Sequence, residues 1–125
     1  EKRTQLNPFK KLEMYQKAES LYKRILQKYP QSDKVEESLF QLGNIQESIY
    51  YREYEDAIAY YRKVLQINPS TQLDVYWRMA ILYDNRLGQR ATAIPLYKRA
   101  AEQSPSQENR LKAQAILEKV KAGEY

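Results

Sequence analysis

Residues 57–69 read AIAYYRKVLQINP, and the spacing within this stretch decides the fold. Ala57, Tyr61 and Val64 stand twelve, eight and five positions before Pro69. These intervals place a small, an aromatic and an apolar side chain on one face of a helix. Proline lacks an N–H group and restricts the residue before it, so the helix must end at this point.

The same spacing occurs at two other places in the chain. The matching sets are Ala18, Tyr22 and Ile25 before Pro30, and Ala93, Tyr97 and Ala100 before Pro105. Three copies in one register indicate a repeated structural unit. Since each unit of a repeat protein packs on its neighbours, the chain is predicted to be an all-α solenoid.

The composition agrees with an elongated helical protein. The chain has 125 residues, enough for one domain, and its hydrophobic content is 42%. Only three glycines are present, which argues against the tight hairpins of an all-β fold. No apolar run reaches the roughly 18 residues of a membrane-spanning helix. Because residue 1 is Glu rather than Met, we expect a fragment or a processed form.

The inventory of reactive side chains argues against catalysis. The sequence has no cysteine and no histidine, which removes thiolate chemistry and the commonest general base and metal ligand. It also lacks a glycine-rich phosphate loop and a nucleophile elbow. We therefore expect neither an enzyme nor a site for a metal or cofactor.

The net charge of +5 is unevenly distributed. Residues 1–30 hold eight basic and three acidic side chains, whereas residues 31–70 hold four and seven. Solvated helix faces account for such a pattern. A charge-complementary partner or head-to-tail self-association accounts for it as well.

Apolar periodicity and turn residues predict six helices. Their expected ranges are 8–28, 34 to the turn near 52, 54–67, 72–86, 90–103 and 105–121. Predicted helix ends are the Asn7-Pro8 cap, an Asp33/Glu36 capping box, a Gly88 C-cap, and a cap at Ser104 followed by Pro105 and Gln107. Pro95 predicts a late or kinked start of the fifth helix. Inward positions include Ile49, Leu111, Ala115 and Ile116.

These residues resemble tetratricopeptide (TPR) repeats, which have two antiparallel helices per unit. The large–small pairs of the first helix correspond to Leu42-Gly43 and Met79-Ala80. The resemblance implies a right-handed solenoid of antiparallel helix hairpins, about six helices with a C-terminal capping helix. It implies one domain over 8–121: a leading helix at 8–30, repeats at 34–69 and 72–105, and the cap at 105–121. Residues 1–7 and 122–125 are expected to be frayed.

The segment Tyr29-Pro30-Gln31-Ser32, followed by Leu42-Gly43, is similar to TPR proteins of the bacterial cell envelope. These include Tol–Pal-associated and outer-membrane-assembly lipoproteins. This similarity favours a periplasmic or envelope location over a cytoplasmic one.

The TPR resemblance also implies a concave groove that binds a peptide or helix of another protein. Its expected lining is Phe40, Asn44, Glu47, Ser48, Trp77, Arg78, Ile81, Asp84 and Asn85. In TPR domains that grip chaperone C-termini, lysines stand where this chain has Phe40 and Asp74. A cationic carboxylate clamp is therefore not expected, and a mixed aromatic and polar groove is predicted instead.

Other interpretations remain open at this point. Phe40 and Trp77 have the helical spacing of core residues. Tyr50 and Tyr51 lie outside the repeat spacing and are either a surface patch for a contact or a cover for a missing neighbour. The chain is a protein-interaction scaffold or, as an alternative, a structural protein that self-associates end to end. An RNA-binding repeat is less favoured, because the expected groove carries carboxylates.

Overall fold

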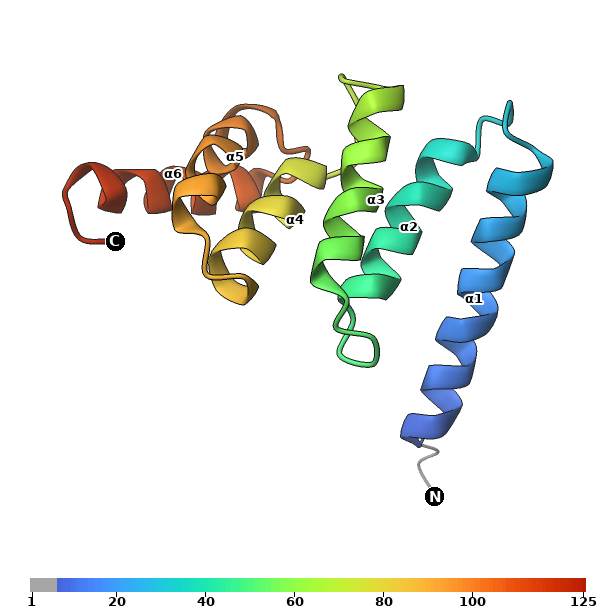
Figure 1. Ribbon diagram of the computed structural model, residues 1–125. Helices are drawn as coiled ribbons and strands as arrows, with labels where there is room; N and C mark the ends of the chain where they lie inside the picture. Colours follow the sequence, from blue (N-terminus) through green and yellow to red (C-terminus); the bar gives the residue numbers. More distant parts are fainter. Residues whose placement is uncertain (1–6) are drawn as a thin grey trace, which may run out of the picture.

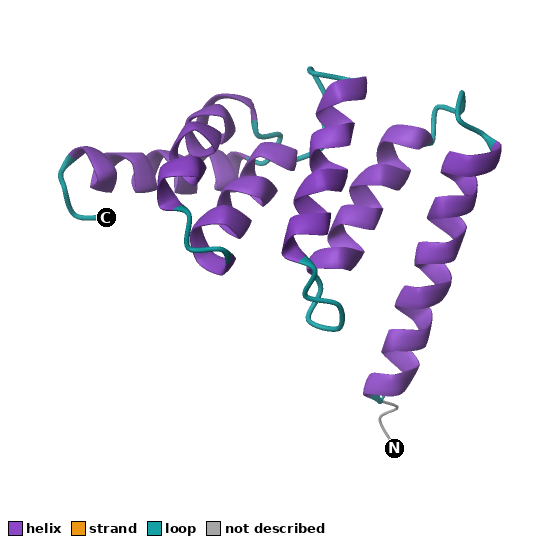
Figure 2. Cartoon of the chain, viewed as in Figure 1, coloured by secondary structure: helices purple, strands orange, loops and turns teal. Residues whose placement is uncertain are grey.

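The computed structural model describes residues 7–125, and the predicted ends at residues 1–6 lie outside this range. The described chain forms six α-helices and one π-helical segment (Figures 1 and 2). The elements are α1 (Pro8–Lys28), α2 (Val35–Glu47), α3 (Tyr54–Ile67), α4 (Val75–Ile81), η1 (Leu82–Arg86), α5 (Arg90–Gln103) and α6 (Gln107–Lys121). No strand occurs among residues 7–125, so the all-α prediction is confirmed.

Helices that follow one another in sequence lie side by side, as expected of a solenoid (Figure 1). The helix α2 packs on α3, and α4 with η1 packs on α5. At the two ends, α1 packs on α2, and α6 packs on α5. This order places α2 and α4 as the first helices of two successive hairpins.

Side-chain caps fix the starts of α1 and α6. The Asn7 Oδ1 atom accepts a hydrogen bond from the Lys10 N–H at 2.8 Å, which confirms the first predicted cap. The Ser106 hydroxyl accepts from the Asn109 N–H at 3.1 Å, so the last helix is capped by Ser106 and not by Ser104. Ser104 instead ends α5 and is buried.

The predicted capping box of α2 is wrong. No side chain caps this helix, and the Lys34 N–H donates to the Ser32 hydroxyl just before it. The Glu36 carboxylate turns outward from the helix end and accepts from the Asn68 amide at 3.2 Å and from the Thr71 hydroxyl. Glu36 therefore ties the start of α2 to the turn after α3.

The same turn delays α4, which begins at Val75 rather than at residue 72. The Thr71 hydroxyl accepts from the Leu73 N–H at 3.1 Å. Side-chain bonds of this kind compete with the helical pattern of the backbone. The helix also ends differently from the prediction, because residues 82–86 take the π conformation.

Three further expectations about helix positions are corrected. The helix α5 starts at Arg90, with the Ala93 N–H bonded to the Gln89 carbonyl, so Pro95 does not delay it. Ile49 is 68% exposed, because α2 ends before it. On α6, Leu111 and Ala115 are exposed and Ala113 is buried, since its small side chain allows the close contact with α5.

The residues that carry the second and third copies of the repeat spacing lie in the core. Ala57, Tyr61 and Val64 are fully buried in one cluster, and Ala93, Tyr97 and Ala100 are buried in the next. Hydrophobic burial contributes about 25 cal/mol per Å² of apolar surface, so burial of these positions stabilises the hairpins. Gly88 has a φ of 64°, as predicted for the turn before α5.

Within residues 7–125, no helix combines the length and the apolarity that crossing a membrane requires.

Candidate partner-binding groove

The residues expected to line the groove lie on the first helices of two successive hairpins. Phe40, Asn44 and Glu47 belong to α2, and Ser48 is its C-cap. Trp77, Arg78 and Ile81 belong to α4, whereas Asp84 and Asn85 belong to η1. Most of these side chains therefore lie on α2 and α4, and the groove that they would line stays a prediction.

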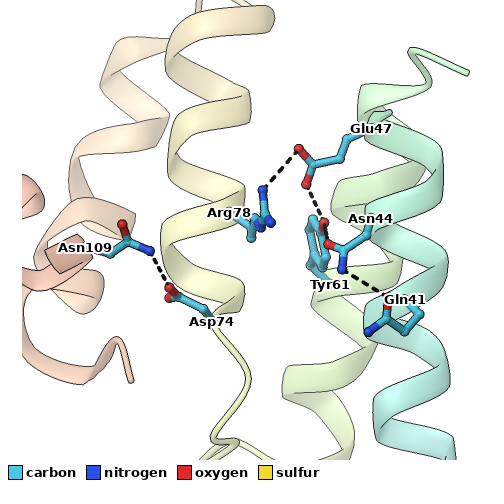
Figure 3. Close-up of polar contacts among 7 residues, drawn as sticks. All are labelled: Gln41, Asn44, Glu47, Tyr61, Asp74, Arg78 and Asn109. Atoms are coloured by element: carbon cyan, nitrogen blue, oxygen red, sulfur yellow. Dashed lines mark hydrogen bonds and ion pairs between the residues drawn. The ribbon is translucent and has the colours of Figure 1, made fainter. Parts of the chain in front are cut away.

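A polar network joins α2, α3 and α4 at this place (Figure 3). The Tyr61 hydroxyl donates to Asn44 Oδ1 at 2.6 Å and also contacts the Glu47 carboxylate. The Asn44 amide donates to Gln41 Oε1 at 3.4 Å. From α4, the Arg78 guanidinium reaches Glu47 Oε1 at 3.8 Å.

Burial and the neighbouring Glu47 carboxylate raise the pKa of Tyr61 far above its ordinary value, since both oppose a phenolate. Tyr61 therefore remains a hydrogen-bond donor at physiological pH. Its donation holds the Asn44 and Glu47 side chains in place, which orders the polar surface between α2 and α4.

The two aromatic candidates belong partly to the core. The centres of the Phe40 and Tyr61 rings lie 5.6 Å apart, and the centres of the Trp77 and Tyr97 rings lie 5.8 Å apart. Both side chains are half-buried. Aromatic pairs of this kind contribute to stability beyond the area that they bury. A partner can thus contact only the part of each ring that remains accessible.

The other candidates differ in their accessibility. The Arg78 side chain is 41% exposed, Asn85 is exposed and Ile81 is half-buried. The Ser48 hydroxyl oxygen is buried, and it makes no hydrogen bond with residues 7–125.

Asp84 does not line the groove, contrary to the expectation. Its side chain is fully buried and accepts from Tyr97 at 2.8 Å, from Arg90 at 3.0 Å and from the Tyr125 hydroxyl. Burial alone would raise the pKa of the Asp84 carboxyl, but these donors, with Tyr125 first, hold it below its ordinary value. Asp84 therefore stabilises the C-terminal hairpin.

The same contacts bring the last residue back to the protein. The Arg90 guanidinium lies 3.8 Å from the centre of the Tyr125 ring, within the range of a cation–π interaction. Residues 122–125 were expected to be frayed, whereas Tyr125 packs on η1 and α5.

At the two positions where a carboxylate clamp has lysines, this chain has Phe40 and Asp74. Asp74 Oδ2 accepts from the Asn109 amide at 2.8 Å, and Asp74 Oδ1 is buried without a hydrogen bond among the described residues (Figure 3). A carboxylate at this position repels a carboxylate ligand. The absence of a cationic clamp stays a prediction from these two positions.

Tyr50 and Tyr51 both contact α1. The Tyr50 ring meets the Tyr15 ring edge to face at 5.2 Å, and the Tyr51 hydroxyl donates to Glu19 Oε1 at 2.7 Å. Burial and the Glu19 carboxylate raise the pKa of Tyr51 to about 12. These two tyrosines fix the α2–α3 turn against α1, which is neither of the two roles that the sequence left open.

Sequence models of the tetratricopeptide repeat match residues 9–32, 37–71 and 74–106, which together cover most of the chain. The chain belongs to the tetratricopeptide repeat family. The matched segments cover nearly all of α1, of the α2–α3 hairpin and of the α4–α5 hairpin of this TPR protein. TPR repeats generally mediate protein–protein interactions and scaffolding, and the family is typically non-catalytic. No curated protein and no solved structure matches the chain.

Two members of the polar network were not among the sequence candidates. The repeat spacing predicts only a core position for Tyr61, and it predicts no role for Gln41. Gln41 lies one helical turn before Asn44, so helical spacing was a usable signal. The direction of the Tyr61 hydroxyl depends on how α3 packs against α2, and no local pattern reports it.

Proposed function

We propose that this chain is a non-catalytic interaction module that binds a peptide or helix of another protein between α2 and α4. The surface proposed to bind the partner, called the groove below, comprises Phe40, Asn44, Glu47, Trp77, Arg78, Ile81 and Asn85. Ser48 is left out because its hydroxyl oxygen is buried. The accessible parts of the aromatic rings supply contact area, and the polar groups supply direction.

The contact between Arg78 and Glu47 carries this proposal. The two side chains come from successive hairpins and meet at 3.8 Å, which is too long for a strong charge-assisted hydrogen bond. A guanidinium has five N–H donors, so Arg78 keeps donors for a carboxylate or carbonyl of a partner. Because its side chain is 41% exposed, these donors are accessible from solvent.

The Asn44 amide is suited to the main chain of a partner. Its carbonyl oxygen is engaged by Tyr61, and its N–H₂ group makes one long bond to Gln41. A second N–H is left to donate to a backbone carbonyl, which gives affinity with little dependence on the partner's sequence. Specificity then comes from the aromatic rings and from Arg78.

Selection of a displayed random-peptide library against the protein, followed by calorimetry, tests this function. We expect the selected peptides to lose about tenfold in affinity with Arg78→Gln, because one charged contact contributes about 1–2 kcal/mol. Trp77→Ala is a poorer probe, since Trp77 packs on Tyr97 and its loss affects folding as well.

Lys98→Gln is the matched control, because Lys98 is an exposed cation on α5, away from the groove. Equal affinities for wild type and Arg78→Gln, or an equal loss with Lys98→Gln, would count against the groove. A crystal structure of the complex in which the peptide does not contact Asn44 would also count against the groove.

The location stays a prediction that rests on the envelope-like segment at residues 29–32. Fractionation of bacterial cells producing the full-length protein tests it, and recovery in the cytoplasm alone would contradict it.

A further inference from the structure

Each copy of the repeat spacing carries two cations directly after its aromatic residue. The pairs are Lys23-Arg24, Arg62-Lys63 and Lys98-Arg99. All six side chains are exposed, so packing of the core does not require them. The helix dipole does not account for them either, because they stand before the last turn of α1, α3 and α5. Their threefold occurrence therefore points to a role at the surface.

The first cation of each pair lines a hollow between its own helix and the elements that follow. Lys23 lies in the hollow between α1 and α3, Arg62 in that between α3 and η1, and Lys98 in that between α5 and α6. These three residues are called the cation row below. Units of a solenoid stack in one direction, so residues in one register follow one another along it. Helices of the described chain form both sides of every hollow.

Most of the charge in the row is not neutralised within the described chain. Among residues 7–125, no carboxylate forms an ion pair with Arg62 or Lys98, and Lys23 pairs with Glu19 at 3.1 Å. Glu55 lines the same hollow as Arg62 but stands seven residues before it, about 10 Å along the helix. At this distance solvent and salt screen the attraction. The row thus presents cations to an external anion.

Tyrosine rings lie beside the cations of α3 and α5. Three exposed cations each lie 5.7 to 5.9 Å from the centre of a tyrosine ring, the pairs being Arg62–Tyr83, Lys63–Tyr60 and Arg99–Tyr76. These tyrosines are half-buried, so part of each ring is accessible. Tyr60 lines the hollow of Lys23, and Tyr83 lines that of Arg62. The surface therefore offers positive charge and aromatic area together.

This combination suits one class of polyanion better than others. In single-stranded nucleic acids, phosphates pair with cations while unstacked bases pack on aromatic rings. An anionic bilayer is flat, so it meets cations on the crests of helices better than cations in the hollows between them. An acidic peptide would meet the cations, but its carboxylate side chains have no planar ring to stack on the tyrosines.

We propose that the cation row and the tyrosines beside it bind a single-stranded nucleic acid. Phosphates of one strand pair with the three cations of the row, and its bases pack on the accessible parts of Tyr60 and Tyr83. The carboxylates that disfavour RNA in the groove belong to α2, α4 and η1. This site lies along α1, α3 and α5 and is independent of the groove.

The acidic helix of a second copy is a poorer occupant. The helix α2 has three glutamates and no basic residue. Two of these carboxylates are engaged within the chain, because Glu36 accepts from Asn68 and Thr71, and Glu47 contacts the Tyr61 hydroxyl. They would have to give up these contacts to reach the row of another copy.

Fluorescence anisotropy with a labelled oligothymidylate of about 12 nucleotides tests the site. We expect Arg62→Gln to weaken binding about fivefold. It should also lower the slope of log Kd against log salt by about 0.7, because one phosphate contact is lost. Lys98→Gln should have similar effects, and the double variant should combine both. Arg78→Gln is the matched control and should change affinity less than about twofold, since this exposed guanidinium lies on α4, outside the row.

An abasic strand of the same length separates the phosphate contacts from the base contacts. It keeps the phosphates, so it should bind, but about tenfold or more weakly than oligothymidylate, because stacking on the rings is lost. Tyr60→Leu should narrow this difference, and circular dichroism verifies that the variant is folded. Polyglutamate and vesicles containing phosphatidylserine serve as competitors. We expect both to displace the strand less well than unlabelled oligothymidylate at equal concentration of negative charge.

Five results would overturn the proposal. Two concern the strand itself: no binding at low salt, or equal affinity for the abasic strand. The third is an equal loss with Arg62→Gln and Arg78→Gln. The fourth is displacement by polyglutamate or by the vesicles as effective as that by oligothymidylate, because the partner would then be an acidic protein or a membrane. The fifth is a dimer of the protein alone that Arg62→Gln dissociates, because the occupant would then be a second copy.

Discussion

Gly43 of α2 lies directly against the ring of Tyr61 on α3. A Cβ atom added to Gly43 would meet Tyr61 Cε1 and lie 2.8 Å from Tyr61 Cδ1, far inside the contact distance of two carbon atoms. The ring has little room to move, because it is fully buried and its hydroxyl is bound by Asn44 and Glu47. The absence of a side chain at position 43 thus sets how closely the two helices of this hairpin approach.

We expect Gly43→Ala to destabilise the protein by up to about 2 kcal/mol. Alanine favours a helix over glycine by about 1 kcal/mol, but overpacking of a filled core costs more than this gain. Urea denaturation of the wild type and the variant measures the change in the free energy of unfolding.

A second substitution separates the clash from other effects of the added methyl group. Tyr61→Leu removes the ring atoms that the methyl would meet, so Gly43→Ala should cost little in that background. A stabilising effect of Gly43→Ala in the wild type would show that the helices separate easily at this contact.

The hairpins could be predicted from sequence because their signals are local. The spacing of Ala57, Tyr61 and Val64 before Pro69 depends only on helical periodicity and on the backbone of proline. These residues fill the core as predicted. The caps at Asn7 and the turn at Gly88 are equally local.

The features that the sequence did not predict depend on contacts between distant residues. Glu36 holds the turn after α3, more than thirty residues away, and thereby changes both the cap of α2 and the start of α4. In the groove, the position of Asn44 is fixed by Tyr61, whose hydroxyl arrives from another helix. The resemblance implies a place in the groove for Asp84, from its position within the repeat. It turns inward because Tyr97, Arg90 and Tyr125 surround its carboxylate.

Pro95 is the sixth residue of α5, and its ring lacks the N–H that would bond to the Ala91 carbonyl. We expect Pro95→Ala to stabilise the protein by about 1–2 kcal/mol, because it restores this bond at an exposed position. The gain is below the roughly 3 kcal/mol of an interior proline, since proline also restricts the unfolded chain. Thermal and urea denaturation measure it, and a loss of stability would mean that Pro95 has a packing role.

The charges of the two end helices, α1 and α6, predict that the protein is a monomer and does not stack end to end. Both α1 and α6 carry more basic than acidic side chains, so contacts between the two ends of different copies bring like charges together. Sedimentation velocity over a range of concentrations at low salt should give one concentration-independent species. Oligomers that form at low salt and dissociate at high salt would instead support the self-assembly alternative.

The buried carboxylate of Asp84 predicts a loss of stability in acid. Its folded-state pKa lies below the ordinary value of 3.8, because the donors around it outweigh the effect of burial. A lowered folded-state pKa gives a stabilisation that is present above pH 3.8 and is lost as the pH falls through the folded-state pKa. We expect the Asp84→Asn variant to lack this part of the acid dependence, and to be less stable than wild type at pH 7 by about 1–3 kcal/mol.

Denaturant unfolding between pH 7 and pH 3 measures both effects. Glu102→Gln, at an exposed position of α5, is the control and should keep the wild-type slope. Glu19 also has a lowered pKa, since the donors Tyr51, Lys23 and Gln46 outweigh its burial. The double variant Asp84→Asn with Glu19→Gln should therefore depend on pH less than either single variant. Equal slopes for wild type and Asp84→Asn would mean that the Asp84 carboxylate does not couple protonation to folding.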